Sequence, residues 1–201
     1  SEIALLAERC IGVAHNPTSN MKLVSGMAPI SRMVAEGVHV GLGSDGEKEN
    51  NNLDLFEEMK FASLLGKVRE DDATAADAWQ TLRMATIEGA RAIGLGNEIG
   101  SLEPGKRADF ITVRTDTPRM TPLLGGEDLN VHHNLVYAAQ GGDVDQVFCD
   151  GRELVRSGVL LTADLNEIRA RVQRTVPDLF RRRAAWLAEH DRGATSPVSG
   201  D

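Results

Sequence analysis

Apolar residues in the first half of the chain follow two spacings in turn, one typical of helices and one typical of buried strands. Residues 1–9 carry apolar positions at helical spacing, and the short apolar run 11–14 follows them. A helix at 29–37 and a buried strand at 38–43 repeat this order. A longer helix is predicted at 53–69, capped by Asn52, and one or two more at 73–95. Alternating strands and helices predict an α/β fold with a parallel sheet.

The pattern changes near residue 96, where glycines become frequent and the predicted strands become short. The dipeptide Asp150-Gly151 lies between two of these strands and predicts a hairpin. The strands are predicted at 110–113, 144–148 and 153–155, with a helical turn at 136–139. A last helix at 165–190 is predicted to be interrupted near Pro177. The predicted divisions are an α/β part at 1–96, a mainly β part at 97–163, the last helix at 164–191 and a disordered tail at 192–201.

Composition and charge exclude several classes of protein. The chain has 201 residues, of which 41% are hydrophobic and 26% charged, a balance typical of globular proteins. Its net charge of −8 is opposite to the basic face of nucleic-acid or anionic-membrane binders. No apolar run is long enough to cross a membrane, and no signal peptide is visible. Cys10 and Cys149 form no C-x-x-C pair, so we expect no disulfide framework, no thiolate zinc site and a cytoplasmic location.

Two polar residues follow the two predicted strands of the first half. His15 comes directly after the first strand and Asp45 comes after the second, 30 positions later, about the length of one β-α-β unit. Parallel strands open onto one edge of the sheet, where α/β proteins bind ligands. An aspartate there can ligate a divalent metal ion and take a proton from water, and a histidine can donate to an oxyanion. A structural histidine and a turn aspartate explain the same residues, so spacing alone leaves both interpretations open.

Further motifs follow one another along the chain. They are residues 13–23 (VAHNPTSNMKL), 37–46 (GVHVGLGSDG), 50–51 (NN), 53–59 (LDLFEEM), 100–110 (GSLEPGKRADF), 134–139 (NLVYAA) and 147–152 (VFCDGR). In this order they resemble the amidohydrolase superfamily, and within it the branch of the 5-methylthioadenosine/S-adenosylhomocysteine deaminases and the triazine hydrolases. The resemblance extends from residue 1 to about residue 185.

The resemblance implies a fold and a chemistry. The expected fold is the C-terminal part of a metal-dependent TIM-type barrel, followed by a small β-sandwich domain and a C-terminal helix. Asp45 is the expected metal ligand and proton shuttle, and His15 is expected to contact the substrate or the tetrahedral intermediate. Asn50 and Asn51 are expected beside the substrate ring. The implied cofactor is one divalent metal ion, with zinc favoured over iron.

The implied reaction is hydrolytic deamination of an N-heteroaromatic ring, such as that of an adenosine derivative, by a metal-bound hydroxide. The expected partner is a small N-heterocyclic substrate, with no nucleic acid or membrane, and the expected assembly is a homo-oligomer. Two alternatives stay open. One is a triazine-type chlorohydrolase, and the other is a catalytically inactive structural homologue.

The chain also departs from the family's pattern. The H-x-H metal-ligand pair of the family is absent from the sequence, and so are its other ligand histidines and its catalytic glutamate. These groups are expected to precede Ser1, which makes the chain the C-terminal portion of a protein roughly twice as long. A sheet that starts at the seventh barrel strand has an open edge and an uncovered interior. We therefore expect the chain to be unstable by itself.

Overall fold

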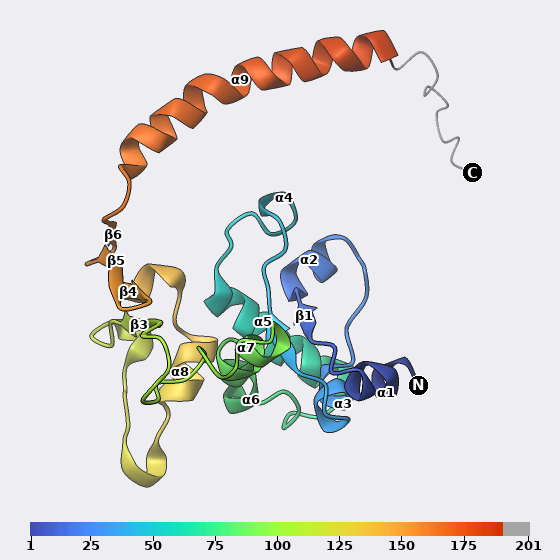
Figure 1. Cartoon of the computed structure of the whole chain (residues 1–201), viewed down its shortest axis with the longest axis vertical. Helices are drawn as coiled ribbons and strands as arrows, with labels where there is room; N and C mark the ends of the chain where they lie inside the picture. The colour runs from blue at the N-terminus through green and yellow to red at the C-terminus, as the bar shows by residue number, and fades with distance from the viewer. Residues whose placement is uncertain (191–201) are drawn as a thin grey trace. The chain divides into compact units, whose positions relative to one another are not determined.

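The computed structural model describes residues 1–190, so the predicted disordered tail lies outside the described residues. By its internal contacts the chain divides into two units, Ser1–Val159 and Leu160–Asp201. Figure 1 shows the course of the chain through both. The first unit contains a small parallel sheet with helices around it and three paired strands of an antiparallel sheet.

The parallel sheet consists of β1 (Val13–His15) and β2 (Val40–Leu42), and it confirms the parallel pairing predicted from the sequence. The two strands pair in register, with His15 opposite Leu42. Two helices, α1 (Glu2–Glu8) and α3 (Ile30–Ala35), precede the two strands, as predicted. Their apolar residues form one of the two buried clusters with the strands, made of Ile3, Ile30, Val38, Val40 and Met84.

Helix α7 (Ile87–Ala92) packs on both strands at close range. Gly41 of β2 and Gly89 of α7 face each other, and a Cβ at Gly41 would lie 2.8 Å from the Cα of Gly89. The absence of both side chains therefore permits this contact between backbones.

The long predicted helix is α5 (Leu55–Glu70), and α6 (Ala78–Met84) with α7 accounts for the predicted helical region 73–95. The prediction of Asn52 as the cap of α5 was wrong. The cap is Asp54, whose carboxylate accepts from the backbone N–H of Phe56 at 2.9 Å. Asn52 instead accepts from the N–H of Asp54 in the preceding turn, so both residues use the local bonding of Asx side chains.

Two short helices were not predicted. The segment after β1 contains α2 (Pro17–Lys22), and the segment after β2 contains α4 (Glu47–Asn50). Both are too short and too polar to show an apolar period. Pro17 stands at the first turn of α2, which is the position in a helix that a proline tolerates best.

The antiparallel sheet has the order β3-β4-β5-β6. The hairpin predicted at Asp150-Gly151 is confirmed, since β4 and β5 pair on either side of it. The strands are β3 (Phe110–Val113), β4 (Val144–Cys149), β5 (Arg152–Arg156) and β6 (Val159–Leu160). Three 3₁₀ turns lie between β3 and β4, at Pro118–Met120, Gly126–Asp128 and Gly141–Asp143. The described residues form one such sheet, so the predicted β-sandwich stays a prediction.

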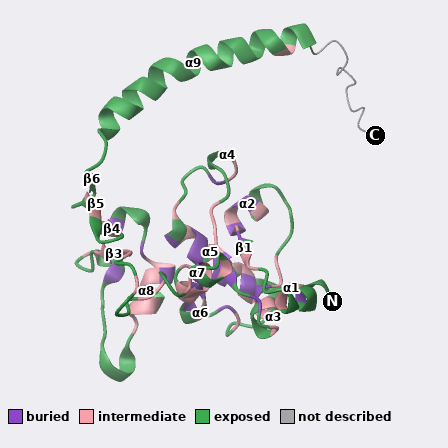
Figure 2. Ribbon diagram, viewed as in Figure 1, coloured by how far each residue is buried: buried purple, intermediate pink, exposed green. Residues whose placement is uncertain are grey.

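Helix α8 (Val131–Tyr137) joins the two predicted parts of the first unit. It packs on α5 and α6, and a buried cluster spans these elements. The cluster consists of Phe56, Met59, Ala78, Met120, Val136 and Ala139. Buried residues gather among these elements and the parallel strands (Figure 2). The boundary predicted near residue 96 therefore runs through one compact unit, and the division into two domains there stays a prediction.

The second unit is dominated by α9 (Leu165–His190), which has no buried residue. The predicted interruption near Pro177 was wrong, because the helix continues through it. A proline inside a helix removes one backbone donor and bends the helix without always ending it, and the ribbon of α9 is bowed (Figure 1). Within residues 1–190, no helix has both the length and the apolar character that a membrane span requires.

Candidate active site

The site predicted from the sequence lies beyond the carboxyl ends of β1 and β2. Helices α2 and α4 stand beyond this same end and contact each other (Figure 1). The two strand ends are close, since the N–H of Gly43 donates to the carbonyl of His15 at 2.9 Å. Any side chain at Gly43 would collide with the side-chain oxygen of Asn16. The glycine therefore leaves room for the side chain of Asn16 beside this loop.

His15 ends β1 with a buried side chain, 4% exposed. Burial disfavours the charged ring and lowers its pKa to about 4, so the imidazole is neutral near pH 7. Its Nδ1 is buried and has no hydrogen-bond partner among the described residues. A buried polar atom without a partner is uncommon in a folded protein. His15 thus retains a free hydrogen-bonding atom in a neutral ring, which suits contact with an uncharged ligand.

Asp45 follows β2 in the left-handed region, with φ of 60°. One carboxylate oxygen accepts from Ser19 Oγ at 2.7 Å and the other from the N–H of Gly46 at 2.8 Å. The hydrogen bond from Ser19, and then the one from Gly46, lower the pKa of this exposed carboxyl below its usual value. Each oxygen keeps a further lone pair. Asp45 is therefore an ionised, accessible carboxylate that can accept a proton or ligate a cation.

The structure connects His15 and Asp45 through α2. Ser19 lies four residues after His15, is 3% exposed and holds Asp45 by its hydroxyl. The hydroxyl oxygen of the neighbouring Thr18 is buried and, among the described residues, unpartnered. The first turn of α2 therefore orients Asp45 through Ser19. Its Thr18 hydroxyl is a second unpartnered polar atom, in addition to Nδ1 of His15.

Asn50 and Asn51, both predicted to contact substrate, have different surroundings. Asn50 is buried, donates to Glu58 Oε1 at 2.6 Å and accepts from the N–H of Leu53 at 2.6 Å. Asn51 is exposed, and its side-chain oxygen accepts from Lys22 Nζ. The side chain of Asn50 therefore stabilises the loop from inside, whereas Asn51 lies at the surface of the loop. Their contact with a substrate stays a prediction.

Sequence reasoning missed Ser19 and Glu58 as members of the site. Glu58 is 1% exposed on α5 and accepts from the N–H of Thr18 at 3.2 Å as well as from Asn50. The helical spacing places Glu58 on the inward face of α5, four residues before the buried Ala62, which is a signal that its side chain is buried but not of its partners. Ser19 had no such signal, since its role depends on a contact with Asp45 across 26 residues.

The donor set for a metal ion is incomplete in the described residues. Among residues 1–190, no group of three or more His, Cys, Asp or Glu side chains could hold a metal ion. Asp45 offers one carboxylate ligand, and a zinc site takes at least three protein ligands. The carboxylate fits as one member of such a set, and the remaining ligands have to come from elsewhere.

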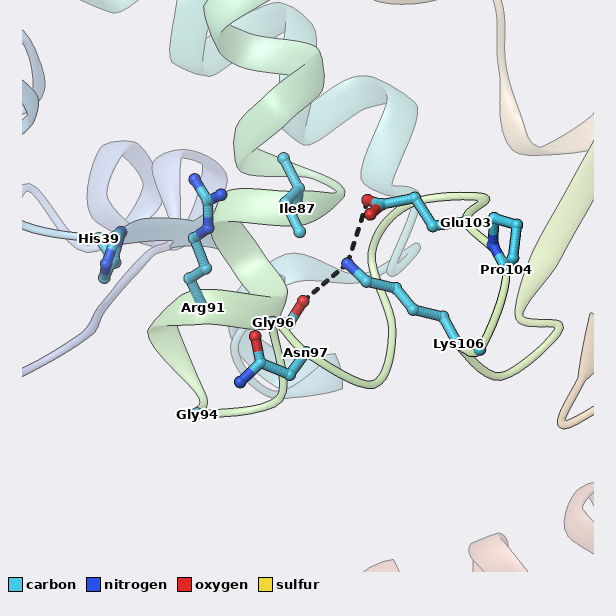
Figure 3. A pocket seen from close by; sticks show the side chains of 10 residues that line it. His39, Ile87, Arg91, Gly94, Gly96, Asn97, Glu103, Pro104 and Lys106 are labelled. Carbon is cyan, nitrogen blue, oxygen red and sulfur yellow. Dashed lines mark hydrogen bonds and ion pairs between the residues drawn. The ribbon is translucent and has the colours of Figure 1, made fainter.

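A separate polar hollow of about 650 Å³ lies beside α7 (Figure 3). It contains no predicted site residue. Its Lys106 donates to the carbonyl of Gly96 at 2.7 Å and pairs with Glu103 at 3.3 Å, and its Arg91 pairs with Glu88. The charges of Lys106 and Arg91 are therefore paired within the chain.

A larger groove of about 1040 Å³ is lined mainly by apolar residues of β1, β2, α5 to α8 and the antiparallel sheet. None of the four predicted site residues lines this groove. The groove exposes the sides of β1 and β2, and each of these strands pairs with only one other among the described residues. The uncovered barrel interior predicted from the sequence stays a prediction.

Comparison with known proteins gives a consistent result. The model of the amidohydrolase family matches residues 1–154. The 5-methylthioadenosine/S-adenosylhomocysteine deaminase of Moorella thermoacetica is 50% identical over 171 residues, which are 85% of this chain and 39% of that protein. The chain thus spans about two fifths of the length of the curated relatives that it matches.

Two solved structures are also similar. The zinc-bound crystal structure of an adenosine deaminase from Xanthomonas campestris has a TM-score of 0.81 and 39% identity, covering 86% of this chain and 38% of that one. The atrazine chlorohydrolase of Arthrobacter aurescens, complexed with zinc, has a TM-score of 0.74 and 26% identity, covering 86% and 37%.

Proposed function

Because this chain belongs to the amidohydrolase family, we propose that it contributes part of the active site of a metal-dependent deaminase acting on an adenosine derivative. The observation that carries the proposal is the position of two residues at the ends of paired parallel strands: the neutral His15, with its unpartnered Nδ1, ends β1, and the ionised Asp45 follows β2. The deaminase relatives at 50% identity support the substrate class. The rest of the site would come from the part of the relatives that this chain does not span.

Asp45 would act as one ligand of a divalent ion, with zinc supported by the zinc-bound structures of related proteins. Such an ion lowers the pKa of water and makes a nucleophile available near neutral pH. The carboxylate of Asp45 would receive the proton that this water loses, and Ser19 would keep that carboxylate oriented. His15 would donate a hydrogen bond to the ring or to the oxygen added to it.

The balance of the reaction is simple. Water adds its oxygen to the ring carbon that bears the amino group, the carbon–nitrogen bond breaks, and the amino nitrogen leaves as ammonia with the proton that Asp45 received from the water. The second proton of the water ends on the neighbouring ring nitrogen, so the product carries a carbonyl at that carbon. The neutral state of His15 fits this step, because a neutral donor stabilises developing charge without adding a buried cation of its own.

Release of chloride from a triazine is the second candidate, supported by the likeness to the atrazine chlorohydrolase. Both reactions displace a group from a carbon of an N-heteroaromatic ring. Identity to the deaminase relatives is higher, at 50% against 26%, and this favours ammonia as the leaving group. The homo-oligomeric state, the cytoplasmic location and the lack of nucleic-acid or membrane partners stay predictions.

Assays of the complete protein with both kinds of substrate test this proposal. We expect ammonia release from 5-methylthioadenosine or a related adenosine derivative and no chloride release from a chlorotriazine. A coupled ammonia assay and a chloride electrode measure the two products under the same conditions. Chloride release without ammonia would favour the triazine alternative, and release of neither product would favour a catalytically inactive homologue.

A further inference from the structure

We propose that Glu58 is a positioning residue that holds together the two loops carrying His15 and Asp45. Its carboxylate binds one group from each loop: the backbone N–H of Thr18 in α2 and the side-chain amide of Asn50 in α4. We call Glu58, Thr18 and Asn50 the loop clamp. The catalytic consequence of the clamp rests on the proposed function, whereas its effect on the loops does not.

Each carboxylate oxygen of Glu58 has its own donor. Oε2 accepts from Thr18 at 3.2 Å, and Oε1 accepts from Asn50 Nδ2 at 2.6 Å. Both partners are N–H groups, so Glu58 acts only as an acceptor, which is the role of a carboxylate. With 1% of its surface exposed, Glu58 has little access to water that could replace these bonds. Loss of an acceptor here leaves buried donors unsatisfied.

The clamp continues into the backbone of the Asp45 loop. The side-chain oxygen of Asn50 accepts from the N–H of Leu53 at 2.6 Å. The segment between Asp45 and α5 is therefore tied to Glu58 through a single side chain. Asn50 is itself 5% exposed, so this tie is shielded from solvent.

The clamp also reaches the carboxylate of Asp45 from the other loop. Thr18 adjoins Ser19, whose hydroxyl donates to Asp45 at 2.7 Å. On the exposed side, Lys22 of α2 donates to the carbonyl of Lys48 at 2.7 Å. The two helices are thus joined at a buried and an exposed point, and Glu58 is the only one of these partners that belongs to α5.

Reversing the polarity of the clamp separates positioning from simple packing. In Glu58→Gln, one amide N–H must face a donor, either that of Asn50 or that of Thr18. In Asn50→Asp, two buried carboxylates face each other. In the double variant Glu58→Gln/Asn50→Asp, the glutamine donates to the aspartate and accepts from Thr18. The aspartate still accepts from Leu53, so the double variant restores every bond and the single negative charge.

The measurements use the complete protein. We expect each single variant to lower kcat/KM for deamination by about 10- to 100-fold, mainly through kcat. The double variant should recover to within about fivefold of the unchanged protein, because the two changes compensate. Amide hydrogen exchange in residues 16–22 and 47–53 should be about tenfold faster in the single variants and return in the double variant. Glu70→Gln makes the same change at an exposed position of α5 and should alter neither quantity.

The outcomes distinguish the clamp from the proposed function. A double variant no better than the single variants, or a Glu58→Gln variant that behaves like Glu70→Gln, would overturn the clamp. Amide hydrogen exchange that is faster in the single variants and restored in the double variant, in a protein without deaminase activity, would support the clamp and contradict the proposed function. Recovery of both activity and exchange in the double variant would support both.

Discussion

Replacing Asp45 with asparagine is expected to lower kcat/KM for deamination by about 10³- to 10⁴-fold in the complete protein. The change removes the negative charge and the capacity to take a proton, while the side chain keeps its size. Asparagine also tolerates the left-handed backbone that Asp45 adopts, at φ of 60°. The remaining side-chain oxygen can still accept from the N–H of Gly46, and the new amide can donate to the hydroxyl oxygen of Ser19, which accepts as well as donates. Loss of activity would therefore report on the carboxylate and not on the loop.

Asp150→Asn is the matched control for this variant. Asp150 is also an exposed aspartate with positive φ, at 51°, but lies in the hairpin between β4 and β5. Its replacement should leave kcat/KM within about twofold. Steady-state kinetics and zinc content should be measured for both variants, and Asp45→Asn should also bind less zinc. An Asp45→Asn variant with activity similar to that of Asp150→Asn would contradict the role of Asp45.

Replacing His15 with alanine is expected to lower kcat/KM by about 10²- to 10³-fold, the usual cost of losing one donor to a developing oxyanion. His15→Gln should lose less, because a glutamine amide can still donate from a similar position. His133→Ala is the control, since His133 is an exposed histidine on α8. Equal losses in His15→Ala and His15→Gln would contradict a hydrogen-bonding role.

The pH profile gives an independent test of the state of His15. Burial lowers its pKa to about 4, so the ring loses its proton well below neutral pH and stays neutral as the pH rises further. His15 therefore should not titrate between about pH 5 and pH 8. Any limb of the kcat/KM profile in this range should lie at the same pH in the His15→Gln variant. Disappearance of such a limb would show that His15 titrates in this range and would contradict the lowered pKa.

The parallel strands could be predicted because they are short apolar runs, and the long helices because their apolar residues recur at helical spacing. The strand at β2 and the helix α5 follow from local patterns, and the parallel pairing follows from the connection between β1 and β2. Helices α2 and α4 could not be predicted in this way. They are held by polar contacts with distant residues, such as that between Thr18 and Glu58, which leave no period in the sequence.

The site could be predicted in part. His15 and Asp45 stand at strand ends, and topology alone places both at one edge of the sheet. The partners that support them depend on the packing of α2, α4 and α5, which no local pattern reports. The burial of Asn50 is an example of what could not be predicted. Its side chain donates to Glu58 and accepts from the N–H of Leu53, and so holds the loop.

Ammonia release before and after removal of metal tests the central claim most directly. The complete protein should release ammonia from an adenosine derivative, lose this activity after treatment with a chelator and regain it when zinc is added back, because the ion makes the attacking water a nucleophile at neutral pH. Ammonia release that persists unchanged in the metal-free protein would contradict a metal-dependent deaminase with Asp45 as a ligand.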